Sequence, residues 1–304
     1  MRHLCSLDDL GPDGLRMMID ASERWRALRG SLDAPQPLQG KSIALVFEKA
    51  STRTRISLEV AVSELGGKPL VITSSGSQLG RGEPIADTAR VLGRMVHAIT
   101  FRTSGEERLH EMAEHSSVPV LNALTDRRHP MQLLADLQTV KQVHGRVDGL
   151  GYAWIGDGNN MANSWIAAAG LLQLRLSVAC PEGYDPDASI LAQARERGGD
   201  IRVVRNPREA ASGAHVISTD VFASMGQEAE HAERLKAFIG MRVTRELLQH
   251  ADPKVIVLHC LPAHRGEEID AEVIDGPHSH VWDQAEARLH SSKAALVWAL
   301  EADE

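Results

Sequence analysis

The chain has 304 residues, 43% hydrophobic and 24% charged, which is typical of soluble globular proteins and long enough for two domains. A formal net charge of −8 argues against general nucleic-acid binding, and no apolar run approaches the length of a membrane span. Three cysteines are too few for a disulfide framework and indicate a reducing cytoplasm.

Short apolar runs alternate with segments of helical periodicity along the whole chain. This alternation predicts an α/β fold with two domains, each a parallel sheet flanked by helices. We expect the domains to span residues 1–145 and 146–304, with a final helix over 284–300 that returns to the first domain. Strands are expected at 42–47, 69–72, 98–101, 118–123, 151–155, 176–180, 201–204, 215–219 and 255–260, and further helices at 85–96 and 131–143. Binding groups should gather in loops after the carboxyl ends of the strands.

The first polar cluster follows the strand expected at 42–47. Ser51 and Thr52 stand where a helix begins, so their hydroxyls, the free N–H groups of the first turn and the helix dipole favour an anion. Arg53 and Arg55 add two permanent charges whose planar forks suit phosphate oxygens. The same pattern fits an ordinary N-cap followed by solvated arginines, so the clusters downstream must decide between the two readings.

Two further features follow the next strands. The stretch at 74–83 reads Ser-Ser-Gly-Ser-Gln-Leu-Gly-Arg-Gly-Glu and is either a donor-rich binding loop or a plain surface loop. Arg102 ends the strand expected at 98–101, where a lone arginine is usually solvated or paired.

The stretch His-Pro-Met-Gln at 129–132 opens a helix. With Pro130 at the first helical position, His129 is the cap and Gln132 lies three residues on, so both can face one point before the helix. Neutral donors of this kind suit a carbonyl oxygen that gains charge during a reaction. A helix cap or a surface group is the alternative for His129.

The stretch 156–164 reads Gly-Asp-Gly-Asn-Asn-Met-Ala-Asn-Ser and invites comparison with the dinucleotide fingerprint G-x-G-x-x-G. Met161 occupies the third glycine position, and Glu182 is only a loose candidate for the acidic ribose partner, so the dinucleotide interpretation is weak. Asn159 and Asn160 are candidate ligand-binding groups instead.

Two strand ends in the second half carry further candidates. Asp220 is suited to fixing an ammonium group, and Ser224 and Met225 follow it in a run of small residues that could form a lid. Cys260 ends the last strand beside His259, but adjacent strand residues point to opposite faces, so His259 cannot easily activate the thiol.

Taken together, these clusters resemble the ornithine carbamoyltransferase family. The Ser-Thr-Arg-Thr-Arg stretch at 51–55 is similar to the carbamoyl-phosphate motif shared by aspartate and ornithine transcarbamylases, and 129–132 to their second shared motif. Asp220 with Ser-Met-Gly at 224–226, and His-Cys-Leu-Pro-Ala-His-Arg-Gly at 259–266, are of the ornithine type. The similarity runs in the same order from the N-terminus to Arg288 and beyond.

The resemblance implies transfer of the carbamoyl group of carbamoyl phosphate to the δ-amino group of L-ornithine, giving L-citrulline and phosphate, a step of arginine biosynthesis. It also implies a homotrimer or a multiple of trimers, with Gln78 often supplied by the neighbouring subunit. The implied carbamoyl-phosphate residues are Ser51, Thr52, Arg53, Thr54, Gln78, Arg102, His129, Gln132, Cys260, Leu261 and Arg288. The implied ornithine residues are Asn160, Asp220, Ser224 and Met225.

The residue types suit this reaction without a metal, a nucleotide or a covalent intermediate, so no cofactor is expected. We expect Asp220 and Cys260 to position the amine, and an oxyanion to be met by Arg102, His129, Gln132 and Thr54. Arg53 would offset the phosphate charge.

Some positions depart from the family pattern, namely Ala287, Phe222 and the Arg-Gly-Glu-Pro segment at 81–84. The alternatives are a carbamoyltransferase for another amine such as putrescine or N-acetylornithine, a Rossmann-type oxidoreductase, and a catalytically silent relative. The sequence does not decide between citrulline synthesis and its phosphorolysis.

Overall fold

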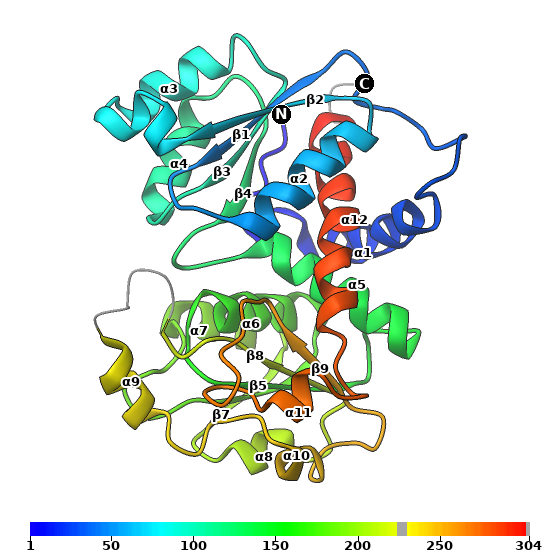
Figure 1. Ribbon diagram of the computed structural model, residues 1–304, viewed down its shortest axis with the longest axis vertical. Helices are drawn as coiled ribbons and strands as arrows, with labels where there is room; N and C mark the ends of the chain where they lie inside the picture. Colours follow the sequence, from blue (N-terminus) through cyan, green and yellow to red (C-terminus); the bar gives the residue numbers. More distant parts are fainter. Residues whose placement is uncertain (224–229, 302–304) are drawn as a thin grey trace. The chain divides into compact units, whose positions relative to one another are not determined.

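The computed structural model describes residues 1–223 and 230–301, which divide into two units. The first unit comprises Met1–Gln138 and Glu286–Glu304, and the second comprises Thr139–Ala285. Two helices, α5 (Pro130–His144) and α12 (Val281–Leu300), contribute residues to both units (Figure 1). Each unit has its own parallel sheet, which confirms the α/β class expected from the sequence.

The first unit is built on a four-stranded sheet in the order β2-β1-β3-β4. β1 (Ser42–Phe47) is an interior strand, and its apolar run is buried from Ile43 onward, as expected for a strand covered on both faces. β2 (Lys68–Thr73) is an edge strand, where Pro69 is tolerated because one side of the strand has no ladder partner. The other main elements are β3 (Ala98–Arg102), β4 (Val120–Leu124), α1 (Gly11–Ala27), α2 (Thr52–Glu64), α3 (Ile85–Leu92) and α4 (Glu106–His115).

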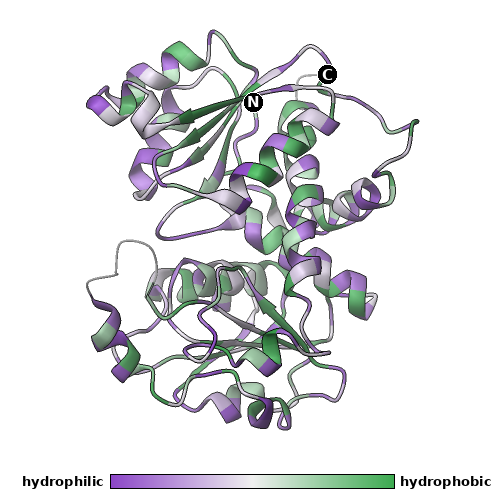
Figure 2. Cartoon of the chain, in the orientation of Figure 1, coloured by the Kyte–Doolittle hydropathy of each residue, from purple (hydrophilic) through white to green (hydrophobic). Residues whose placement is uncertain are grey.

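Apolar side chains of α3 and α4 cover one face of this sheet. Ile85 of α3 and Met112 of α4 belong to the same buried cluster as Val46 of β1 and Phe101 of β3. The hydropathy colouring shows these central strands mostly in green, whereas purple is concentrated on the helices and loops (Figure 2). The hydrophobic effect therefore fixes the sheet and leaves the polar strand ends for binding.

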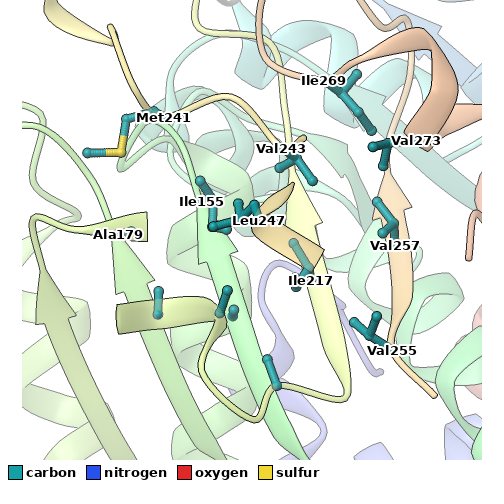
Figure 3. Close-up of a cluster of buried hydrophobic side chains, with 14 of the residues drawn as sticks. Ile155, Ala179, Ile217, Met241, Val243, Leu247, Val255, Val257, Ile269 and Val273 are labelled. Carbon is teal, nitrogen blue, oxygen red and sulfur yellow. The ribbon is translucent and has the colours of Figure 1, made fainter. Parts of the chain in front are cut away.

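The second unit contains a five-stranded parallel sheet in the order β7-β6-β5-β8-β9. One face of the sheet is buried against the short helices α8, α10 and α11, with Ile217, Leu247 and Val273 in one cluster (Figure 3). The elements are β5 (Gly151–Ile155), α6 (Asn160–Leu172), β6 (Arg175–Ala179), α7 (Ala188–Glu196), β7 (Asp200–Val204), α8 (Pro207–Ala211), β8 (Val216–Thr219), α9 (His231–Ala237), α10 (Arg245–Leu248), β9 (Ile256–His259) and α11 (Ala271–Ile274).

Helices α6 and α7 pack closely against each other. A Cβ atom at Gly170 would lie 2.6 Å from the Cα of Ala194, so only glycine allows this approach.

The strand registers align the carboxyl ends of neighbouring strands. In the first unit, Phe47 at the end of β1 pairs with Arg102 at the end of β3. In the second unit, Ile155 pairs with Thr219, which pairs in turn with His259. The loops that follow these residues therefore start at the same edge of each sheet, where ligands bind in such folds.

The nine expected strands are all found within the described residues, with ends that differ by no more than two residues. Helix α1 was not expected from the sequence. Within residues 1–223 and 230–301, no helix has both the length and the apolar composition that crossing a membrane requires.

Candidate active site

The N-terminus of α2 presents free hydrogen-bond donors. Ser51, its N-cap residue, has an extended backbone but makes no side-chain capping bond, and the first turn contains no acidic residue. Arg53 is half-buried and forms no ion pair with any described residue, whereas Arg55 pairs with Glu59 at 3.4 Å. The helix start is therefore positive and its donors are available to an anion.

A pocket of about 760 Å³ lies beside this helix start, within the first unit. Ser51, Thr52 and Arg55 line it, together with Ser74 from the loop after β2. Ser74 donates a hydrogen bond from its hydroxyl to the carbonyl of Glu48 at 3.0 Å, which fixes this loop against the end of β1.

The loop after β2 does not bring Gln78 into the pocket. A Cβ atom at Gly80 would lie 2.1 Å from the carbonyl oxygen of Ser74, so glycine lets the loop fold back on itself. Gln78 lies within this fold, is exposed, and is absent from the pocket lining.

Two arginines converge on one buried hydroxyl in the first unit. Arg102 donates to Thr54 Oγ1 at 3.3 Å, and Arg288 donates to the same oxygen. All three residues are buried, with exposed fractions of 5% or less. Two permanent positive charges are thus concentrated in a region of low dielectric constant, where they act strongly on any neighbouring group.

His129 lies within the field of these arginines. Its burial, and then the positive charges of Arg288 and Arg102, lower the pKa of His129 well below its usual value. The imidazole is therefore neutral at pH 7, as expected from the sequence, and one of its nitrogens can donate a hydrogen bond.

Gln132 presents an acceptor rather than a donor. Its Nε2 donates to Asp136 Oδ1 at 2.8 Å, one turn further along α5. Its Oε1 is buried and accepts no hydrogen bond from the part of the chain that the structure describes. A buried acceptor without a partner is costly, so a ligand that donates an N–H group would stabilise it.

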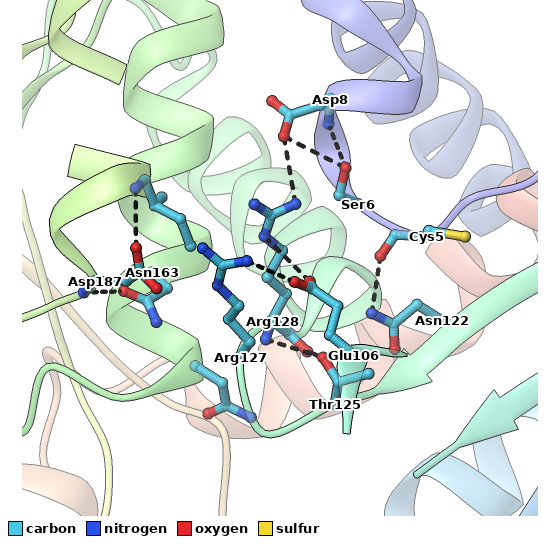
Figure 4. A network of polar contacts seen from close by, with 12 residues as sticks. Cys5, Ser6, Asp8, Glu106, Asn122, Thr125, Arg127, Arg128, Asn163 and Asp187 are labelled. Carbon is cyan, nitrogen blue, oxygen red and sulfur yellow. Dashed lines mark hydrogen bonds and ion pairs between the residues drawn. The ribbon is translucent and has the colours of Figure 1, made fainter. Parts of the chain in front are cut away.

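A polar network holds the segment that leads to His129 (Figure 4). Arg127 pairs with Glu106 at 2.8 Å, and Arg128 lies 3.5 Å from both Glu106 and Asp8. The amide N–H of Thr125 donates to the Arg128 carbonyl at 2.9 Å, which closes the turn. These contacts fix the position of the His129 side chain at the start of α5.

In the second unit, Asp220 accepts hydrogen bonds from three donors. These are Asn159 Nδ2 at 2.9 Å, the amide N–H of Val221 at 2.9 Å and the thiol of Cys260 at 3.0 Å. Asn159 also caps α6, because its Oδ1 accepts from the amide of Met161 at 2.9 Å. The structure therefore brings together three loops that the sequence had marked separately, after β5, β8 and β9.

Asn160 is the first residue of α6, directly after Asn159. Ser224 and Met225, which the resemblance places on ornithine, lie outside the described residues.

His259 and Cys260 point to different partners, as expected from strand alternation. His259 Nδ1 accepts from the amide of Leu261 at 2.9 Å, so its Nε2 carries the proton and faces Glu268 Oε1 at 3.0 Å. Leu261 has a left-handed backbone with φ of 59°, an unusual conformation for leucine that occurs mainly at functional sites. Asp220, His259 and Cys260 lie close enough to suggest a metal trio, but both nitrogens of His259 are already engaged.

Sequence reasoning missed the buried pair of Asp157 and Arg234. The Arg234 guanidinium binds the Asp157 carboxylate, donates to the Phe222 carbonyl at 2.5 Å and lies 4.9 Å from the centre of the Tyr184 ring. Burial raises the pKa of Asp157 to about 6, although Arg234 acts in the opposite direction. The G-D-G spacing marks Asp157, but no signal in the sequence identifies Arg234 as its partner.

Two family models match the chain almost end to end. The aspartate/ornithine carbamoyltransferase carbamoyl-P binding domain matches residues 2–142, and the Asp/Orn binding domain of the same family matches residues 148–299.

Several similar proteins carry one description. Ornithine carbamoyltransferase from Geobacter metallireducens is 54% identical, with 97% of this chain and 98% of the relative covered. The anabolic ornithine carbamoyltransferase of Pseudomonas aeruginosa is 49% identical, with 99% and 98% covered. The structure of ornithine carbamoyltransferase from Pyrococcus furiosus is 42% identical with a TM-score of 0.94, covering 99% of this chain and 97% of that one.

The low pKa of His129 predicts a pH-dependent stability. Unfolding exposes an imidazole that takes up a proton below its ordinary pKa of about 6.5, whereas the native state keeps it neutral. The stability that the neutral imidazole contributes is therefore present above this pH and lost as pH falls, by up to about 1.4 kcal/mol per pH unit. In His129→Asn, the unfolding free energy should fall less than in the parent chain between pH 7 and pH 5, measured by urea unfolding.

The matched control is His250→Asn, because His250 is an exposed histidine. Its pH curve should run parallel to that of the parent chain. A parallel curve for His129→Asn as well would contradict the prediction.

Proposed function

The chain belongs to the aspartate/ornithine carbamoyltransferase family as an ornithine carbamoyltransferase, and we propose from its geometry which residues carry the reaction. The reaction transfers the carbamoyl group of carbamoyl phosphate to the δ-amino group of L-ornithine, giving L-citrulline and phosphate. The chain is thus a transferase of arginine biosynthesis, and the anabolic relatives support that direction.

The phosphate of carbamoyl phosphate binds at the start of α2. The observation that carries this assignment is an uncapped helix N-terminus without acidic residues, beside the unpaired Arg53. Ser51, Thr52 and the first-turn N–H groups supply donors, and Arg53 supplies a planar fork that fits phosphate oxygens. Thr54 is held at the end of this turn by Arg102 and Arg288, which extend the positive field.

The carbamoyl group binds between donors and one acceptor of the first unit. Arg102 and the neutral His129 donate to the carbonyl oxygen and to the oxyanion that forms on it. Gln132 Oε1 accepts from the carbamoyl N–H₂, because its own Nε2 is held by Asp136. This role differs from the donor role expected from the sequence.

Ornithine binds to the second unit through Asp220, Asn160, Ser224 and Met225. Asp220 attracts the cationic amine, and Cys260, held against Asp220 at 3.0 Å, orients it. The neutral δ-nitrogen attacks the carbamoyl carbon, and the bond from that carbon to the phosphate oxygen breaks with its electron pair. The δ-ammonium group releases one proton to solvent before the attack, and a phosphate oxygen takes the second proton after it, so the products are citrulline and hydrogen phosphate. Leu261 is the remaining residue that we propose for carbamoyl-phosphate binding.

The assembly is a homotrimer or a multiple of trimers, and the compartment is the cytoplasm. The exposed Gln78, which does not line its own pocket, supports a role in a neighbouring subunit's site. The three cysteines form no disulfide, which fits a reducing compartment.

The reaction itself is tested by citrulline formation from carbamoyl phosphate with each of three acceptors. L-ornithine should give product, because its α-amino and carboxylate groups meet the second unit's loops, and putrescine and N-acetylornithine should give at least a hundredfold less. Reactions that omit either substrate are the blanks. If putrescine or N-acetylornithine reacted faster than L-ornithine, that amine would be the acceptor instead.

Loss of the Arg53 fork should weaken transition-state binding. A charge-assisted hydrogen bond contributes about 1.5–3 kcal/mol, so Arg53→Ala should lower kcat/KM for carbamoyl phosphate roughly tenfold to a hundredfold or more. The matched control is Arg208→Ala, which removes an exposed arginine already paired with Glu246 at 2.6 Å. If Arg53→Ala kept a near-normal kcat/KM, the proposal that Arg53 binds the phosphate would be wrong.

A shared site predicts recovery of activity in mixed assemblies. Arg53→Ala and Gln78→Ala chains, each with reduced activity, should regain part of it when they are dissociated together and reassembled, because some sites then receive both native residues. Arg53→Ala mixed with His129→Asn should recover nothing, since both residues belong to the same chain's half of the site. Equal results for the two mixtures would argue that Gln78 acts within its own chain or not at all.

A further inference from the structure

Two histidines and one glutamate converge in the second unit, outside the residues proposed for the reaction. His231 begins α9, and His264 and Glu267 follow β9 in a turn. His231 Nε2 lies 3.0 Å from Glu267 Oε2, and His264 Nδ1 lies 3.6 Å from the same oxygen. From this geometry we propose that the three side chains bind one divalent transition-metal ion of the Zn²⁺, Co²⁺ or Ni²⁺ class.

The separations fit a coordination shell. Bonds of about 2.0–2.1 Å from a tetrahedral Zn²⁺ place neighbouring ligand atoms about 3.3–3.4 Å apart. The two measured separations lie on either side of this value, and the three ligand atoms lie within 4.8 Å of one another. One ion can therefore bind after only small movements of these three side chains.

The orientation of the rings also favours an ion over a simple hydrogen-bonded pair. Both imidazoles turn a nitrogen toward the same carboxylate oxygen, which needs only one donor to be satisfied. The centres of the His231 and His264 rings lie 6.3 Å apart at 88°, and each ring turns a nitrogen toward Glu267 Oε2. Two imidazole nitrogens and one carboxylate select Zn²⁺, Co²⁺ or Ni²⁺, whereas Mg²⁺ and Ca²⁺ prefer all-oxygen sites.

Two of the three ligands are held by a closed turn. The amide of Glu267 donates to the His264 carbonyl at 2.9 Å, and the amide of Gly266 donates to the Ile269 carbonyl at 2.8 Å. A turn fixed in this way loses little conformational entropy when a metal binds.

The charges of the neighbouring arginines are offset by carboxylates. Arg265 pairs with Asp275 at 2.8 Å, and Arg242 pairs with Asp270 at 3.2 Å. Repulsion between these arginines and a bound cation is therefore reduced.

The ion would tie α9 to the turn after β9. Leu235 of α9 and Ala263 of the turn already pack against one apolar cluster of the second unit, and the ion would add a polar contact between the two elements. The metal therefore acts as a clamp that stabilises this part of the second unit. It lies outside the reaction chemistry, so the proposal does not rest on the proposed function.

The experiment is a metal titration of the full-length, tag-free chain that carries Cys260→Ser. That background removes the thiol of the Asp220, His259 and Cys260 trio, which would otherwise compete for the ion. Co²⁺ is followed by its visible absorption and Zn²⁺ by calorimetry and by the thermal midpoint. We expect one ion per chain, Co²⁺ bands of low-coordinate N/O ligation and a thermal midpoint that rises with Zn²⁺.

Each of His231→Ala, His264→Ala and Glu267→Gln should weaken the affinity at least tenfold. The side chains of all three are partly exposed, so metal-free variants should keep the parent's circular dichroism spectrum. The matched control is His280→Ala, which removes a histidine that faces a single carboxylate, Asp283, at 2.8 Å. Unchanged affinity in the three variants, equal loss in the control, or no binding at millimolar metal would overturn the proposal.

Discussion

The convergence of Arg102 and Arg288 on the Thr54 hydroxyl is the contact on which the first unit's chemistry depends. It joins the end of β3, the first turn of α2 and the middle of α12 through one oxygen atom. Two like charges at a buried point raise each other's energy, and burial together with this field lowers the pKa of His129 and keeps it neutral. A dianionic phosphate bound where we propose would reverse this penalty, so the substrate itself would stabilise the arrangement. Binding energy is then available for positioning, which is where much of the acceleration of a carbamoyl transfer arises.

Parallel strands bring the separate motifs of each unit together. The pairing of Phe47 with Arg102 sets the start of α2 beside the end of β3, although the two are about fifty residues apart in the chain. The ladder from Ile155 through Thr219 to His259 does the same for the three loops around Asp220. A one-residue slip in either ladder would turn the strand-end side chains to the opposite face, so buried apolar strands enforce the site geometry indirectly.

The strands and the helix starts could largely be predicted from the sequence, because continuous apolar runs and helix-start signals are local. β1 and β5 were placed to the residue, and the donor-rich start of α2 followed from the Ser-Thr-Arg order alone. Pairings across the fold were not predictable in the same way. That Gln132 gives its N–H₂ to Asp136, and that Arg234 reaches Asp157, depend on side-chain direction and packing that one sequence does not encode locally. Helix α1 was missed although Leu15, Met18 and Ile19 form a buried stripe at helical spacing.

The buried charges around Asp220 support the proposal that the second unit binds a cationic substrate. Arg234 pairs with Asp157 and, at 3.6 Å, with Glu230, so carboxylates outnumber the arginine in this cluster, which also contains Asp220. With a pKa of about 6, most Asp157 side chains are ionised at neutral pH. The favourable interactions of this carboxylate therefore only just compensate for the burial of its charge. An approaching ammonium group favours the ionised form of Asp157, so substrate binding and ionisation of Asp157 reinforce each other. Ornithine carries two ammonium groups and one carboxylate, a net charge of +1 that is opposite in sign to this cluster. The attacking nitrogen must nevertheless lose one proton before it attacks the carbamoyl carbon, and a phosphate oxygen is proposed to take the second proton after the attack.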